Sequence, residues 1–257
     1  MTQLRRLVCI LVIAAAAGAA LPVAAQRGPA AEPSRLPADV LGLACAPALT
    51  SEPSAATLRV TGNQDSVVRR VFLPGDLVTI NAGAAQGMEV GREYYVRRTQ
   101  VPPGQRPTAL TPGVIRTVGW VRVWAVEDAM SLATITHACD TIETDDYLEP
   151  FALPVVPAAG PRPKPERGNY GRVVIGNDRR IMFGRDDYLI VDRGASHGVA
   201  PGAQFVVYRD KHQTDNFLFE LGEAVAVDVR PETSTLRVTI SRDALLAGDL
   251  VAIRREP

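Results

Sequence analysis

Residues 83–91 read GAAQGMEVG, and residues 194–202 read GASHGVAPG. Each stretch spaces three glycines four residues apart, and both lie between short apolar runs. Glycine adopts the positive φ values that a chain reversal needs, so we expect each stretch to join two strands. The six turn glycines are Gly83, Gly87, Gly91, Gly194, Gly198 and Gly202.

The correspondence extends outward from these turns in both directions. Before them, residues 76–81 match 187–192. After them, residues 94–98 match 205–209, and beyond a variable loop residues 119–126 (GWVRVWAV) match 222–229 (GEAVAVDV). One frame that holds on both sides of a loop indicates an internal repeat.

Each copy consists of short runs of β-forming residues bounded by Asp, Gly and polar turns, a pattern typical of strands. We expect six or seven short strands per copy. Sheets this small protect their edges by curling on themselves. The sequence therefore predicts an all-β protein of two homologous small β-barrel or sandwich modules, over residues 57–151 and 170–257.

The segments outside the two modules are rich in proline and alanine. Residues 26–56 lack periodicity and are interpreted as a flexible tether. Residues 152–169 contain five prolines between positions 154 and 165. Such a composition favours extended backbone, so we expect a semi-rigid linker between the modules.

The N-terminus has the features of an export signal. Arg5 and Arg6 precede an apolar run over residues 7–21, and residues 23–25 (VAA) form a small-residue cleavage site. The run is shorter than a membrane-spanning helix needs, which favours a cleaved signal peptide over residues 1–25. The alternative is an uncleaved N-terminal anchor. We expect an exported protein of the periplasm or cell envelope, with no transmembrane helix after cleavage.

Cleavage of the signal would leave one pair of cysteines, Cys45 and Cys139. A single pair in an exported chain is usually a disulfide, and closing so long a loop contributes at most about 4–5 kcal/mol. Lipid-anchor and metal-ligand interpretations are the weaker alternatives. A bridge requires the two Cα atoms to lie about 4.4–6.8 Å apart.

The formal charge is balanced, with 28 basic and 28 acidic residues. No overall field would draw the chain to nucleic acid, which is therefore not an expected partner. No cofactor or metal site is predicted, because the three histidines are dispersed along the chain.

The turn unit, an apolar strand, Asp or Asn, x-Gly-x-x-x-Gly-[Val/Met]-x-x-Gly-x-x-[Phe/Tyr]-x-Val, resembles two exported families. One is the C-terminal domain of the flagellar assembly protein T. The other is the periplasmic β-region of the rod-shape-determining scaffold protein. The second copy is the closer match, from residues 172–176 through 192–194 to the strand near Ile253. Similar modules accompany LysM peptidoglycan-binding segments. The resemblance implies a non-enzymatic role in the bacterial envelope.

Two carboxylate pairs are of the kind that acid/base catalysis or calcium binding uses, namely residues 145–146 and 186–187. Both occur beside a turn at a strand start, where Asp is a common turn former. No Ser-His-Asp or Cys-His arrangement is visible in the sequence, and we expect no enzyme activity. A site assembled from distant residues is the alternative.

Trp120, Arg122 and Trp124 alternate along one predicted strand and share a face. The counterpart of Trp120 in the second copy is Glu223, which would be a costly buried charge if this position belonged to the core. We therefore expect Trp120 at a rim or interface. Either it packs against the linker or the other module, or the face is a docking or sugar-stacking surface.

From the sequence we expect a structural scaffold or adaptor that works with other envelope proteins in cell-envelope or flagellar-type assembly. The alternative is a glycan-binding module for peptidoglycan, and an enzyme is the third interpretation.

Overall fold

A computed structural model describes residues 36–50, 55–65, 67–101, 113–176, 180–210 and 217–255. The expected signal peptide lies outside the described residues. Apart from the helix α1 (Ala38–Ala44) and short 3₁₀ turns, the regular structure is β-strand, which confirms the all-β class. No helix in the described part of the chain has the length and apolar character needed to cross a membrane.

Among the described residues, the first unit together with the N-terminal strand β1 has nine strands and a 3₁₀ turn: β1 (Ala48–Thr50), β2 (Val60–Asn63), β3 (Val71–Phe72), β4 (Leu77–Ile80), η1 (Ala84–Gln86), β5 (Glu93–Gln100), β6 (Gly113–Val126), β7 (Ser131–Ala138), β8 (Ile142–Glu143) and β9 (Tyr147–Pro150). Its main sheet has the order β2-β4-β7-β6-β5-β9, and β1 pairs with β6. A bridge between Arg59 and Tyr147 joins the two ends of this sheet.

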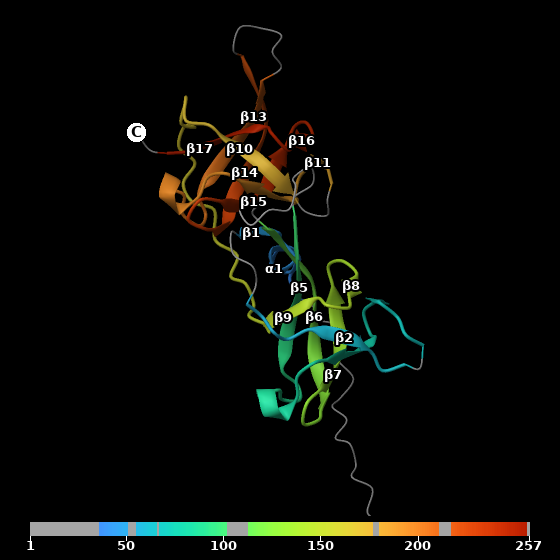
Figure 1. The fold of residues 1–257 in the computed structure, drawn as a ribbon. Helices are drawn as coiled ribbons and strands as arrows, with labels where there is room; N and C mark the ends of the chain where they lie inside the picture. The colour runs from blue at the N-terminus through green and yellow to red at the C-terminus, as the bar shows by residue number, and fades with distance from the viewer. Residues whose placement is uncertain are drawn as a thin grey trace, which may run out of the picture.

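The second unit has these elements: β10 (Gly171–Gly176), β11 (Met182–Phe183), β12 (Tyr188–Val191), η3 (Ala195–His197), β13 (Gln204–Asp210), β14 (Leu218–Val229), β15 (Ser234–Ser241), β16 (Leu245–Leu246) and β17 (Leu250–Ile253). Six of its strands form a closed barrel in the order β10-β12-β15-β14-β13-β17. The two strand orders correspond element by element, and Figure 1 shows the two units one above the other.

The strand registers also correspond. Val96 pairs with Gly119 and is followed by a bulge, and Val207 pairs with Gly222 and is followed by a bulge. Each unit has its own cluster of buried aliphatic side chains, because alternate strand residues point inward. That the two units superpose as one fold, Gly83 on Gly194, remains a prediction.

The glycine turns divide into two physical types. Gly87 and Gly91 have φ of 77° and 85°, and their counterparts in the second unit have nearly the same values, as we expected. Gly83 is different, because its φ is −135°. A Cβ atom there would lie 2.1 Å from the Glu127 carbonyl oxygen, and at Gly194 one would lie 2.3 Å from the Arg230 oxygen. For these two glycines the positive-φ explanation was wrong. Glycine is needed there because another part of the backbone lies too close to leave room for a Cβ atom.

The adjacent aspartates form turns, as interpreted from the sequence. Asp145 and Asp186 have positive φ values of 75° and 66°. The next residue in each case accepts a backbone hydrogen bond: Asp146 from Glu143 at 2.7 Å, and Asp187 from Gly184 at 2.8 Å. These carboxylates therefore hold turns at strand starts.

The linker is not a free spacer. Its backbone contacts the second unit, where the Gly160 amide donates to the Gly202 oxygen and the Glu166 amide donates to the Ile253 oxygen. Pro165 also forms a bridge with Arg254. The part of the linker around residues 160–166 is therefore attached to the barrel that follows it.

The expected tether also needs correction. Residues 36–50, which we call the N-terminal clasp, contain α1 and β1. Pro37 precedes the first turn of α1, and Asp39 lies in that turn, where a negative charge favours the helix dipole. Figure 1 shows α1 and β1 between the two units. Of the remainder of the expected tether, residues 26–35 and 51–54 lie outside the described residues.

Candidate functional site

Trp120 is fully buried in an apolar cluster that includes α1 of the clasp, so the prediction of a rim or docking surface was wrong. The alternative that it packs against another segment of the chain fits better, although the segment is the clasp and not the linker or the other module. Trp120 lies on β6 and is 0% exposed. Its ring contacts that of Tyr95 edge-on at 6.2 Å and is tilted against that of Phe151 at 5.4 Å. Ala44 and Leu41, three residues apart on α1, belong to the same apolar cluster. A side chain so enclosed offers no face for sugar stacking.

The other two residues of the predicted surface lie nearer to solvent. The Arg122 side chain is 40% exposed, and its Nη2 is 2.8 Å from Glu93 Oε1 on the neighbouring strand. Trp124 is partly buried. The glycan-binding alternative therefore loses the residue on which it mainly depended.

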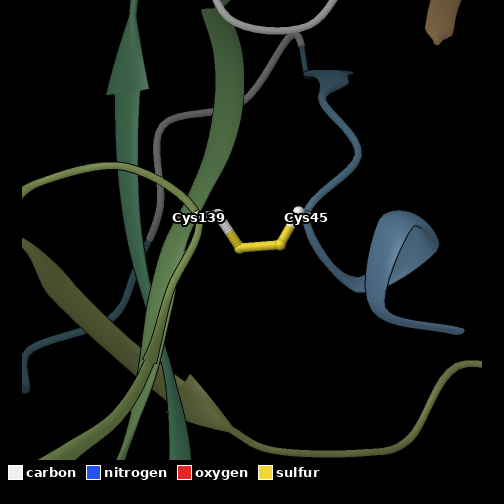
Figure 2. The surroundings of a disulfide bond; sticks show 2 residues. All are labelled: Cys45 and Cys139. Carbon is white, nitrogen blue, oxygen red and sulfur yellow. A yellow bond between two sulfur atoms is a disulfide. The ribbon is translucent and has the colours of Figure 1, made fainter. Parts of the chain in front are cut away.

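The clasp is attached to the first unit by a disulfide, as we predicted. Cys45 follows α1 directly, Cys139 follows β7, and their Cα atoms are 5.7 Å apart. Figure 2 shows the bond joining the clasp to the strands of the first unit. The bond holds α1 over Trp120, and it accounts for the enclosure of the tryptophan.

We expect the double variant Cys45→Ser, Cys139→Ser to lose about 2–4 kcal/mol of unfolding free energy, because the unfolded chain is no longer cross-linked. Urea unfolding of the oxidised wild type and the variant measures the loss. The wild type in reductant should match the variant. A variant as stable as the oxidised wild type would contradict the structural role of the bond.

His137 packs against Trp120, with the two rings nearly parallel and their centroids 4.3 Å apart. Burial lowers the pKa of the His137 imidazole from its ordinary value of 6.5. The ligand atoms of His137, Cys45 and Cys139 lie within 4.8 Å of one another. However, the two sulfur atoms are bonded to each other, and metal binding needs thiolates.

The lowered pKa of His137 predicts a loss of stability in acid. As pH falls below about 6.5, the unfolded chain takes up this proton before the folded chain does, and the folded state loses stability until its own pKa is passed. We expect His137→Ile, the residue at the equivalent position 240, to remove this component. Urea midpoints at pH 7.5 and pH 5 should differ less in the variant. An equal pH dependence would contradict the assignment.

The position equivalent to Trp120 is also buried in the second unit. Glu223 is 4% exposed and faces three arginines. Arg162, from the linker, is ion-paired with its carboxylate, and Arg254 Nη2 and Arg242 Nη2 lie 3.5 and 3.7 Å from Glu223 Oε1. The assumption that a charge would not be buried here was wrong, because paired charges can be. Each unit thus covers this position with the segment that precedes it in the chain.

The clasp also contacts the second unit. Thr235 Oγ1 donates to the Pro47 oxygen at 2.9 Å, and Arg230 Nη1 donates to the Leu49 oxygen at 3.0 Å. The Tyr188 hydroxyl donates to the Asp39 oxygen at 3.4 Å. The clasp therefore joins both units, with the disulfide on one side and these hydrogen bonds on the other.

A hollow of about 420 Å³ lies beside the clasp, between β5 and β6 of the first unit, the start of the linker and β14 of the second. Two arginines in its wall have carboxylate partners. Arg97 Nη1 is 2.6 Å from Glu149 Oε2, and Arg230 Nε is 3.2 Å from Asp228 Oδ2. These charges therefore already serve contacts within the protein.

The same Arg–Asp ion pair occurs at corresponding positions of the two units, and it was not predicted from the sequence. Arg98 binds Asp146 through two hydrogen bonds of 2.6 and 2.8 Å, and Arg209 binds Asp249 through two of 2.8 and 2.7 Å. Burial raises the pKa of the Asp146 carboxyl, and the Arg98 guanidinium opposes that rise. The sequence signal was that Arg and Asp occupy matching positions in both copies.

Comparison with protein-family models and with curated proteins gives no match.

Proposed function

We propose that this chain is a non-enzymatic, exported protein of the bacterial cell envelope, in which two copies of one barrel module act as a structural scaffold or adaptor. The proposal includes a cleaved signal over residues 1–25. Its partners would be other envelope proteins, consistent with the resemblance to flagellar-assembly and rod-shape proteins.

The observation that carries the proposal is the clasp. Residues 36–50 contact both barrels, through the Cys45–Cys139 bond and the hydrogen bonds from Thr235 and Arg230. Such attachments hold two binding surfaces at one spacing. Fixed spacing is useful to an adaptor, since it lowers the entropy lost when two partners are held together.

The test compares the wild type with the variant Arg230→Gln, Thr235→Val in envelope extract of the native bacterium. The variant removes two side-chain donors to the clasp and leaves the disulfide intact. We expect chemical cross-linking to join the wild type to a defined set of envelope proteins and the variant to fewer of them. Recovery of the full-length, uncleaved chain in the cytoplasm, or equal cross-linking by both proteins, would contradict the proposal.

A further inference from the structure

The two units meet beside the start of β6. Val114, on β6, is 1% exposed and packs against Ile175 and Ile190, on β10 and β12 of the second barrel. Leu49 of the clasp and Val174 complete this apolar cluster. β1 lies alongside β6 here, with Leu49 opposite Val114. The start of β6 therefore packs against the first two strands of the second unit.

The start of β14 is the equivalent element of the second unit. From the shared pairs Val96–Gly119 and Val207–Gly222, the registers place Phe217 at the position of Val114. Phe217 is 59% exposed, and its ring contacts that of Phe219 at 4.9 Å. Among the described residues, no strand occupies the place beside β14 that β1 takes beside β6.

The sheet face that Val114 contacts on the second unit has an equivalent on the first unit. This face is apolar in the second unit and polar in the first. Gly62 pairs with Thr79 in the first unit at the place where Ile175 pairs with Ile190 in the second, and the same bulge precedes each pair. The residue before Gly62 is Thr61, which shares a 2.9 Å hydrogen bond with the hydroxyl of Thr79. A second copy of this chain therefore presents a polar face where an apolar one is needed.

We propose that Phe217, beside the start of β14, is the anchor by which the second unit binds another polypeptide, through a two-strand sheet face bearing Val and Ile on that partner. The barrel–barrel contact within the chain defines this partner chemistry, because it shows what covers the equivalent residue. A buried aromatic side chain is a common source of interface energy. The use of the contact in the cell rests on the proposed adaptor role.

The experiment introduces the apolar face into the first unit of the same protein by substitution. An acceptor variant, Thr61→Val, Gly62→Ile, Thr79→Ile with Phe217→Ser, has the face but not the anchor. The wild type has the anchor but not the face. A Cβ at Gly62 would lie 3.5 Å from the Thr79 hydroxyl, an ordinary contact. The second unit already holds the pair Ile175 and Ile190 at the equivalent place, so we expect the acceptor to fold. Sedimentation should show each protein alone as a monomer and their mixture as a one-to-one complex.

The matched control mixes the acceptor with the single variant Phe217→Ser, for which we expect binding weakened about thirtyfold or more. A second acceptor that keeps Gly62 is used if the first acceptor does not fold. Absence of a complex with folded acceptors, or equal binding by Phe217→Ser, would overturn the inference. Because only purified protein is used, such a failure would leave the envelope cross-linking result unaffected.

Discussion

Trp120→Ala lowers the unfolding free energy of the first barrel by about 3–5 kcal/mol, the usual cost of truncating a fully buried tryptophan. The substitution leaves a cavity between α1, the disulfide and β6. The disulfide restricts how far α1 can move to fill that cavity. Urea unfolding of the oxidised protein, followed by far-ultraviolet circular dichroism, measures the loss.

Trp124→Ala is the matched control, since it removes the same side chain from a partly buried position on the same strand. We expect less than half the loss caused by Trp120→Ala. If Trp120→Ala instead left stability unchanged, Trp120 would not be enclosed, and the surface hypothesis made from the sequence would regain its basis.

Glu223→Ala destabilises the second barrel by about 3–5 kcal/mol, because removing one member of a buried ion cluster leaves the others uncompensated. Arg254 is the most affected, since its side chain is only 12% exposed and cannot turn freely to water. Glu223→Gln keeps the shape of the side chain and should cost less. The unfolding free energy from urea titration is the measurement.

Arg242→Ala serves as the control for this cluster. Its side chain is 50% exposed, and exposed ion pairs contribute about 1 kcal/mol or less. A loss from Arg242→Ala as large as that from Glu223→Ala would indicate general charge imbalance and contradict the special role of the buried carboxylate.

The strands and turns could be predicted from the sequence because their signals are local. Alternating apolar residues indicate the strands, and spaced glycines mark where the strands end. The second occurrence of the same pattern along the chain supports each assignment. The disulfide could also be predicted from the sequence, because only one pairing of cysteines is possible after the expected cleavage.

The coverings of Trp120 and Glu223 could not be predicted, because they depend on contacts between distant segments. The clasp is rich in apolar residues, and Leu41 and Ala44 of α1 show the three-residue spacing that places two side chains on one helix face, but no local signal indicates which distant strand that face packs against. Likewise, three arginines from separate parts of the chain surround Glu223. The charge of Glu223, considered alone, predicted an exposed side chain. The arginines that surround its carboxylate allow the side chain to be buried.

The clasp also has a consequence for the order of folding. Its hydrogen bonds to Thr235 and Arg230 join residues 188 and 181 positions apart, whereas the disulfide spans 94. Synthesis delivers the N-terminal residues first, and contacts between distant residues form slowly. Residues 36–50 are therefore among the earliest to be made and among the last to complete their contacts. A chain that stops before residue 230 contains the first unit and its disulfide, but only a nearly finished chain can form the hydrogen bonds from Arg230 and Thr235 to the clasp.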